Sequence, residues 1–461
     1  MNFKDNFEKK TKERIISTVL ELLDKNPESN VERIFSLLRK SIKDEYSLKI
    51  VEDVYVQYSN SPNIQEYVKN ILKNTDKNCL KKFFKNMLGN ALWYGVSKRE
   101  KIGMDNDIKI PFTLLISPSM RCNLHCTGCY AANYCKKDDI PYEEVDRLVK
   151  EARDLGIYYI IVLGGEPFFN EYMLDIYKKY NDIYFMPFTN GTLFDESLVD
   201  KLQSLGNVMP MLSIEGFKKE TDTRRGDGIF NSVMKGMDLL NKKGVPFGSS
   251  VATGNNNINT VISNQFIDML YEKGARMLWY FMFMPVGDNP IQDINYMLSP
   301  TERLTLGKRT REIRKEMKLF PIDFFNDAPY VGGCIAGKYY CHINSKEDLE
   351  PCIFSHFATE NVKNKPLLEA LKCDYFKELR RRHPYNKNLL LPCPMVDNPT
   401  QIREIVKFTG AKPTHPSAEI MIKDKEFIDK IDKLAANFKP YADEAFEKEF
   451  NNKGNYDMSK G

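Results

Sequence analysis

Apolar positions in the first part of the chain follow a helical period. One predicted helical face carries Val31, Ile34, Phe35, Leu38 and Ile42. A stripe of this width normally packs a helix against a core. We therefore expect a helical N-terminal region over residues 1–107 that serves for packing or as a lid. The functional alternative is a docking platform for a partner or an apolar substrate.

From about residue 108 the pattern changes to short, β-prone apolar runs separated by helical patterns. The runs are 112–116, 157–163, 183–188, 208–214, 245–252 and 277–284. The clearest helix between them, 142–155, ends before Gly156, which suits a left-handed helix cap. This alternation predicts an α/β core over residues 108–325 with a parallel sheet. Such sheets gather their chemistry at the carboxyl ends of the strands.

Composition narrows the class of protein. The 461 residues are 42% hydrophobic, enough to bury a sizeable core. Lys and Arg number 67 against 63 Asp and Glu, so net charge gives no pull toward nucleic acid. We see no apolar run long enough for a membrane span and no apolar segment of a signal peptide near the N-terminus. The expected location is the cytoplasm, where ten cysteines are metal ligands or free thiols rather than disulfides.

Three of these cysteines share one loop. Cys122, Cys126 and Cys129 have the spacing C-x3-C-x2-C and begin six residues after the first strand run. Thiolates this close can turn toward one compact soft metal centre. Zinc would normally need a fourth protein ligand. A 4Fe-4S cluster on three cysteines leaves one iron open to a small chelating molecule, although a zinc site or chance spacing stays open on the triplet alone.

Polar residues also end the next three strand runs. The second run ends in Gly164-Gly165-Glu166-Pro167, the third in Thr189-Asn190-Gly191 and the fourth in Ser213-Ile214-Glu215-Gly216. Glycines let a backbone approach a ligand closely. Arg224 and Arg225 follow, and a guanidinium suits a carboxylate because its N–H groups fork onto two oxygens. Taken singly, these residues also fit ordinary turns or a solvated arginine.

In combination, the triplet, GGEP, the polar strand ends and Arg-Gly resemble the radical S-adenosylmethionine (SAM) enzymes. The resemblance implies a partial (β/α)6 TIM-like barrel and a 4Fe-4S cluster whose free iron is chelated by SAM. In that family an electron from the cluster cleaves SAM, and the 5′-deoxyadenosyl radical removes a hydrogen atom from the substrate. It also implies a reducing partner such as flavodoxin or ferredoxin.

The resemblance assigns roles to individual residues. The cluster ligands are Cys122, Cys126 and Cys129. The SAM-binding residues are Gly164, Gly165 and Glu166 for the methionine amino group, with Pro167 stiffening the exit of their turn, Thr189, Asn190 and Ser213 for the ribose, and Arg225, in preference to Arg224, for the carboxylate. Two positions depart from the family pattern. Glu215 stands where relatives usually have aspartate and can bind the ribose or meet substrate. Gly128 replaces an aromatic residue beside adenine, a place that Tyr130 can take.

A second group of cysteines, Cys334, Cys341, Cys352 and Cys393, lies in residues 326–400. It resembles the SPASM/twitch-like domain that holds auxiliary clusters in many radical SAM maturases, and it implies one auxiliary 4Fe-4S cluster. Glu347 stands where relatives have a glycine in the hairpin turn. If Cys341 is not a ligand, one auxiliary iron is open to substrate. A four-cysteine zinc site is the alternative. Residues 401–461 are expected to form a charged helical tail.

The resemblance predicts a radical SAM oxidoreductase or transferase. Peptide or protein modification is the leading expectation, because this architecture most often serves it. A lipid or other small apolar substrate is the alternative, since Trp279, Tyr280, Phe281 and Phe283 can line an apolar cavity. A non-catalytic iron–sulfur or zinc protein that carries electrons or senses redox state is a rival from another class. The GGEP and Arg-Gly elements argue against this rival, because an electron carrier needs no SAM pocket.

Overall fold

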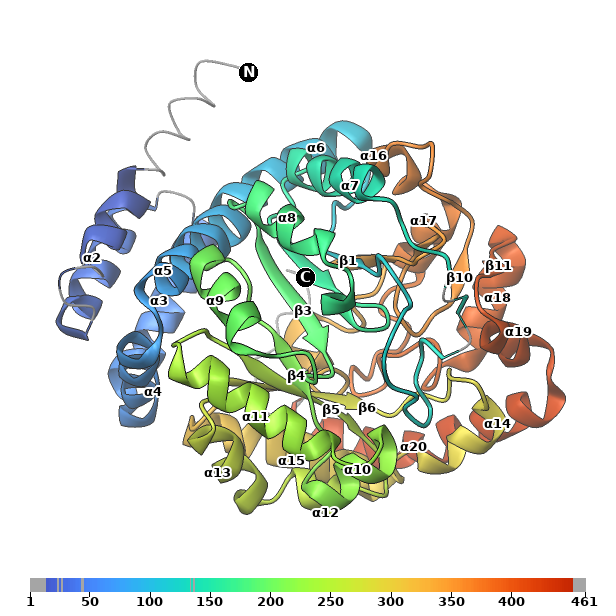
Figure 1. The fold of residues 1–461 in the computed structure, drawn as a ribbon. Coiled ribbons are helices and arrows are strands. Elements are labelled where there is room, and N and C mark those ends of the chain that lie inside the picture. Colours follow the sequence, from blue (N-terminus) through green and yellow to red (C-terminus); the bar gives the residue numbers. More distant parts are fainter. Residues whose placement is uncertain are drawn as a thin grey trace.

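The computed structural model describes residues 14–450 except 23–24, 26–27, 43–44, 133 and 136. The expected N-terminal region and tail therefore extend beyond the described residues at 1–13 and 451–461. A sheet lies at the centre, helices surround it, and the N-terminal helices form a separate layer on one side (Figure 1). No helix in the described ranges is long and apolar enough to cross a bilayer.

The N-terminal region is helical, as the apolar stripes predict. Its helices are α2 (Val31–Ser41), α3 (Glu45–Asn60), α4 (Pro62–Asn74), α5 (Lys77–Lys82), the π-helix η2 (Phe83–Tyr94) and α6 (Gly95–Asn106). Ser61 caps α4 by accepting a hydrogen bond from the Ile64 N–H. The π-helix packs beside strands β2 and β3, and such helices are frequent at functional sites.

The central sheet contains all six strands that the apolar runs predict. They are β1 (Thr113–Ile116), β2 (Tyr159–Val162), β3 (Tyr184–Thr189), β4 (Met211–Ser213), β5 (Gly248–Thr253) and β6 (Met277–Met282). Neighbouring strands are parallel and follow chain order, β6-β5-β4-β3-β2-β1. The six-strand core of a partial TIM-like barrel is therefore confirmed.

The sheet continues beyond these six strands at both edges. β7 (Phe320–Asp323) pairs in parallel with β6, and β8 (Tyr340–Ile343) pairs in parallel with β1. β9 (Leu349–Glu350) then pairs antiparallel with β8. Two strands from residues 326–400 thus belong to the same sheet as the barrel core.

The helices that lie between the strands along the chain surround the sheet (Figure 1). They are α7 (Tyr142–Asp154), α8 (Tyr172–Lys179), α9 (Glu196–Leu205), α10 (Lys218–Arg225), α11 (Ile229–Lys242), α12 (Ile258–Val261), α13 (Asn264–Glu272), α14 (Pro290–Asp293) and α15 (Pro300–Glu316). Gly156 follows α7 with a φ of 88°, the left-handed conformation expected there. Val145, Leu148 and Val149 of α7 are fully buried.

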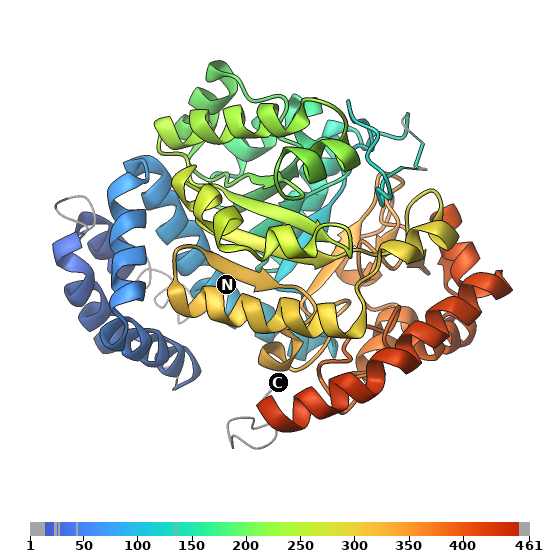
Figure 2. The same cartoon turned by 90° about the horizontal axis from the view of Figure 1, so that it is seen from below.

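The C-terminal part of the chain, from α16 onward, packs against the barrel through its helices. These are α16 (Leu367–Ala370), α17 (Asp374–Arg382), α18 (Pro399–Thr409), α19 (Pro416–Lys423) and the long α20 (Lys425–Glu449), with a small sheet of β10 (Phe357–Ala358) and β11 (Lys412–Pro413). Figure 2 shows α20 running alongside α15. Phe427, Ile431 and Phe438 are buried, so one face of the expected helical tail packs on the molecule.

Candidate active site

The three cysteines of the triplet line one cavity at the carboxyl end of the sheet. This cavity, of about 680 Å³, is bounded by Cys122, Cys126 and Cys129. The loop is shaped by its own backbone: Cys129 N–H donates to Cys126 O at 3.3 Å, and Leu124 N–H donates to Cys122 Sγ at 3.4 Å. An N–H aimed at sulfur favours a thiolate, the form that binds metal.

The thiols of the triplet need a bound metal centre in order to lose their protons. Burial raises the pKa of Cys122 and of Cys129, so without a cation both stay protonated at neutral pH. A coordinated metal removes that proton. Within the described ranges no three His, Cys, Asp or Glu side chains converge on a single ion. A cluster instead spreads its thiolates over separate irons.

Glu166 joins the ends of β2 and β3. Its buried carboxylate accepts hydrogen bonds from Thr189 Oγ1 at 2.7 Å, from Asn190 N–H at 2.8 Å and from Phe168 N–H at 3.1 Å. Burial raises the pKa of Glu166 to about 7, and these donors oppose the rise. The carboxylate therefore positions the loops. Gly164 and Gly165 line a second cavity, of about 530 Å³, which shares the three cysteines with the first and extends into the barrel.

The glycines of this turn are required by close packing. A Cβ on Gly164 would lie 2.1 Å from Ser119 O, and one on Gly165 would lie 2.1 Å from Arg121 O. The cysteine loop thus passes directly over the GGEP turn. Pro167 starts the short 3-10 helix Pro167–Phe169 that leaves the turn.

Two further strand ends reach this region. Asn190 Nδ2 donates to Asn123 Oδ1 at 2.8 Å and lies 3.7 Å from Cys122 Sγ. Ser213 Oγ lies 3.3 Å from Ser250 Oγ on the neighbouring strand. Asn190 is thereby attached to the cysteine loop, and Ser213 remains on the cavity wall.

Glu215 is bound by both arginines. Its Oε1 accepts from Arg225 Nε at 2.8 Å and Arg225 Nη2 at 2.6 Å, and from Arg224 Nη1 at 2.5 Å. Its Oε2 accepts from Ala252 N–H at 3.0 Å. Burial raises the pKa of the Glu215 carboxyl, but Arg224 and Arg225 outweigh it, and the net pKa lies below the usual value. Both oxygens expected to serve a ribose therefore already have protein donors.

Asp293 is a carboxylate that the motifs did not reveal. It lies on α14, is 4% exposed and lines the cysteine cavity. Its Oδ2 has no hydrogen-bond partner within the described ranges. Burial raises its pKa to about 6, and Asp288 adds to the effect. Only the fold brings α14 over the cysteine loop, so no local sequence signal could have found it.

Aromatic residues occupy both sides of the third cysteine. Gly128 has a φ of 64°, and a Cβ there would lie 2.3 Å from the Phe283 ring. Phe283 therefore fills space beside the position where relatives carry an aromatic residue. The Tyr130 hydroxyl accepts from Gly164 N–H at 3.1 Å, which holds the tyrosine on the cavity wall.

Three cysteines of the second group gather around Tyr340. The Tyr340 hydroxyl donates to Cys352 Sγ at 2.8 Å. Burial is the main cause of the raised pKa values of Cys334 and Cys393; a nearby thiol, Cys352 for Cys334 and Cys334 for Cys393, adds to each. Phe354 N–H donates to Cys352 Sγ, and Met395 N–H to Cys393 Sγ, both at 3.4 Å. Both are backbone N–H contacts to sulfur of the same kind as that from Leu124 to Cys122.

Cys341 lies apart from the other three cysteines of this group. It follows Tyr340 on β8, and successive side chains of a strand point to opposite faces. Cys341 is fully buried, and its thiol is influenced by Cys373 rather than by the other three. The structure therefore unites three of the four cysteines expected to act together.

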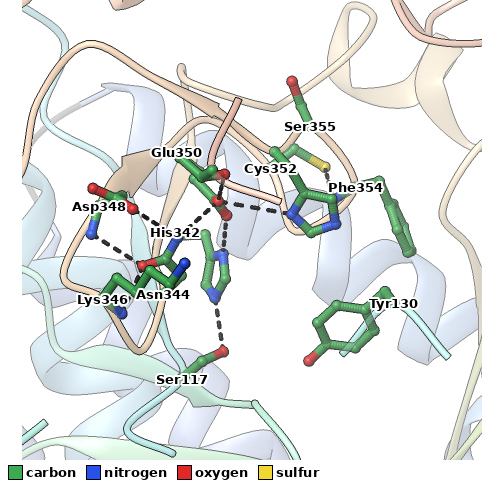
Figure 3. A network of polar contacts seen from close by, with 12 residues as sticks. Ser117, Tyr130, His342, Asn344, Lys346, Asp348, Glu350, Cys352, Phe354 and Ser355 are labelled. Atoms are coloured by element: carbon green, nitrogen blue, oxygen red, sulfur yellow. Dashed lines mark hydrogen bonds and ion pairs between the residues drawn. The ribbon is translucent and has the colours of Figure 1, made fainter. Parts of the chain in front are cut away.

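A buried polar network lies between the end of β1 and the hairpin that precedes Cys352 (Figure 3). Glu350 accepts from His342 Nδ1 at 2.7 Å and from Asn344 Nδ2 at 2.9 Å. His342 Nε2 lies 2.7 Å from Ser117 Oγ at the end of β1. Burial raises the pKa of Glu350, but hydrogen bonds from His342 and His356 bring it well below the usual value. The network joins the strand before the first triplet to the hairpin before Cys352.

Comparisons with known proteins show what this chain is similar to. Residues 116–261 match the family model described as the Radical SAM superfamily. The AdoMet-dependent heme synthase of Methanosarcina barkeri is 23% identical over 290 residues, 56% of this chain and 82% of that protein. A cysteine-type anaerobic sulfatase-maturating enzyme of Clostridium novyi is 27% identical over 320 residues, 60% of this chain and 80% of that protein.

Two solved structures have a similar fold. Streptococcus suis SuiB bound to S-adenosylmethionine has a TM-score of 0.54 at 20% identity, over 65% of this chain and 76% of SuiB. The structure described as native anSMEcpe with bound AdoMet has a TM-score of 0.51 at 21% identity, over 75% of this chain and 100% of that chain. With the cysteine triplet and the strand-end residues around one cavity, this chain is an enzyme that contains a domain of the radical SAM superfamily, matched over residues 116–261.

Proposed function

We propose that this enzyme binds a 4Fe-4S cluster and SAM, cleaves SAM reductively and abstracts a hydrogen atom from a substrate inside the barrel. One observation carries the proposal: a single cavity is lined by the three cysteines, by Gly164 and Gly165, and by both arginines. In this proposal, the cluster ligands, the SAM-binding residues and the space for the substrate all belong to this one cavity. When bound, the cluster and SAM supply the electron and the radical that removes hydrogen.

The protein's own residues would bind and orient SAM. The backbones of Gly164 and Gly165 face the methionine amino group, as the resemblance implies. Arg225 meets the carboxylate, and Arg224 adds a donor, since its Nε–H is buried without a partner in the described ranges. Glu215 fixes both guanidiniums. Asp293 takes over the expected ribose contact of Glu215, because its Oδ2 is free to accept from a hydroxyl.

We also propose one auxiliary 4Fe-4S cluster on Cys334, Cys352 and Cys393. The support is the shared environment of the three thiols and the backbone N–H groups aimed at two of their sulfurs. Tyr340 would hold the Cys352 sulfur through its hydroxyl. Cys341 is left out of this set, so one iron lacks a cysteine from these four.

Two substrate classes have support. Peptide modification is supported by SuiB, a structure of which is described as bound to the precursor peptide SuiA, at a TM-score of 0.53 and 20% identity. A small apolar molecule is supported by the cavity itself, whose wall is mainly apolar. The cavity favours the second class.

Anaerobic reconstitution with iron and sulfide tests the reaction. We expect about eight irons per chain and formation of 5′-deoxyadenosine from SAM after reduction. Cys126→Ala should abolish cleavage. Cys135→Ala, in the same loop but exposed, is the matched control and should cleave normally. Bound zinc without cleavage would favour the non-catalytic rival, and cleavage by Cys126→Ala would refute the assignment of the first cluster.

A further inference from the structure

One wall of the second cavity is formed by the segment that carries the later cysteines. The lining residues from this segment are Ile335, Tyr340, Ile353 and Phe354. Ile335 directly follows Cys334 in the chain, and Ile353 directly follows Cys352. These cysteines therefore belong to the same stretch of chain as the wall of the cavity in which we propose that the substrate reacts.

Two residues of this wall donate hydrogen bonds to one sulfur. The Tyr340 hydroxyl donates to Cys352 Sγ at 2.8 Å, and Phe354 N–H donates to the same atom at 3.4 Å (Figure 3). Within the described ranges, Tyr340 is the only side chain that both lines the cavity and donates to a sulfur of the later cysteines. The Cys352 sulfur thus has a hydroxyl donor that faces the substrate space.

The fold holds Tyr340 in place by its backbone and by its ring. It is the first residue of β8 and is 3% exposed. Its N–H donates to Ile335 O at 3.4 Å, and its carbonyl accepts from Gly337 N–H at 2.9 Å. Its ring meets that of Phe324 edge to face, with 6.0 Å between the centres. Little conformational freedom is then lost when the hydroxyl points at the sulfur.

A donor aimed at a ligand sulfur changes how readily an iron–sulfur cluster accepts an electron. Reduction adds one negative charge to a cluster and its thiolates. A hydrogen bond to a thiolate therefore stabilises the reduced form more than the oxidised form, and the reduction potential rises. Burial strengthens the effect, because no water competes for the sulfur and the local dielectric constant is low.

We propose that Tyr340 is a positioning residue that raises the reduction potential of the auxiliary cluster through its hydrogen bond to Cys352. The inference rests on the auxiliary cluster of the proposed function. It gives the tyrosine a role beyond holding the sulfur in place. The hydroxyl makes the cluster a better electron acceptor, at the wall of the cavity in which the substrate would react.

A redox titration of the auxiliary cluster by itself tests the proposal. Replacing Cys122, Cys126 and Cys129 together by Ala removes the first cluster, so the EPR signal of the reduced full-length protein reports the auxiliary cluster alone. In this background, Tyr340→Phe should retain about four irons per chain. The equilibrium constant for one-electron reduction should fall about tenfold, which makes the midpoint potential about 59 mV more negative.

Tyr159→Phe in the same background is the matched control. Tyr159 is also a buried residue of the cavity lining whose hydroxyl donates to a sulfur, in this case Met186 Sδ at 2.9 Å. The potential should not change. Site-specific 3-fluorotyrosine at position 340 should act in the opposite direction to Tyr340→Phe, because fluorine makes the phenol a stronger donor and should raise the potential. A tyrosine that only fills space would produce neither shift.

The outcomes separate the two levels of inference. Equal potentials with tyrosine and phenylalanine at position 340, or an equal fall in Tyr159→Phe, would overturn the role of Tyr340 and leave the auxiliary cluster standing. Loss of the auxiliary irons in Tyr340→Phe would make the tyrosine a structural support and would also reject the proposal. Zinc in place of iron in the triple cysteine variant would reject the auxiliary cluster itself, and this inference with it.

Discussion

Nε and Nη2 of Arg225 both donate to Oε1 of Glu215, at 2.8 and 2.6 Å, in an almost fully buried ion pair. Arg224 shares the same oxygen. A single carboxylate therefore balances two guanidiniums at the edge of the cavity. Removing one partner of a buried ion pair is costly, because the remaining charge has neither water nor a counter-ion.

Glu215→Ala should lower the free energy of unfolding by about 3 to 5 kcal/mol. Urea unfolding of the anaerobic protein measures it. Asp154→Ala removes an exposed ion pair with Lys150 and should cost at most about 1 kcal/mol. An equal, small effect of both changes would contradict the role given to Glu215.

Glu166 should make the protein less stable as the pH rises. Its folded pKa is raised to about 7, above the ordinary value of 4.5 for glutamate, so its contribution is fully present below about pH 4.5 and is lost as the pH rises through 7. Compared with Glu166→Gln, the wild type should lose up to about 3 kcal/mol of unfolding free energy between pH 4.5 and pH 8. Parallel pH profiles of the two proteins would show that Glu166 stays ionised.

Asp293→Ala should weaken SAM binding about tenfold, because it removes the free carboxylate oxygen at the cysteine cavity. Equilibrium dialysis with labelled SAM measures the change in the reconstituted enzyme. Asp105→Ala, at an exposed aspartate outside the lining of both cavities, is the control and should leave the affinity unchanged. Unchanged affinity in Asp293→Ala would return the ribose contact to Glu215.

Iron content should separate the four later cysteines. Cys352→Ala and Cys393→Ala should each lose about four irons per chain on reconstitution, the content of one cluster. Cys341→Ala should retain the full content, because its side chain lies on the other face of β8. Loss of iron in Cys341→Ala would make it a ligand after all.

Glu347→Gly should stabilise the hairpin before Cys352. Glu347 has a φ of 65°, a left-handed conformation that costs a residue with a side chain about 1 kcal/mol or more. Its Oε1 is also buried without a partner in the described ranges. We expect a gain of about 1 kcal/mol in urea unfolding, whereas Asp348→Gly, at the next residue, should be destabilising. A loss of stability in Glu347→Gly would show that its side chain compensates the strain.

The sequence predicted what depends on local periodicity. All six β-prone runs form strands, and the helix before Gly156 ends where its glycine indicates. Parallel strands then bring Cys122, Glu166 and Asn190 to one edge, so the strand-end rule predicted which residues lie together. The sequence shows that Gly128 departs from the family pattern, but only the fold brings Phe283 beside it.

Other features depend on contacts between distant residues. The pairing of β8 with β1 and the contact of Ser117 with His342 have no local signature. Spacing grouped Cys341 with three other cysteines, but the alternation of side chains along β8 places it elsewhere. The cavity inside the barrel depends on the combined volume of side chains from eight strands, which periodicity does not report.

The place of β8 in the sheet also affects how the chain can fold. β1 is made early in synthesis, yet its outer neighbour comes from residues 340–343. Until that segment emerges, β1 is an open edge, available to other chains. A fragment that stops near residue 325 would carry a complete cysteine triplet and keep that edge exposed. The closing strand thus makes solubility of the barrel depend on the segment that follows it.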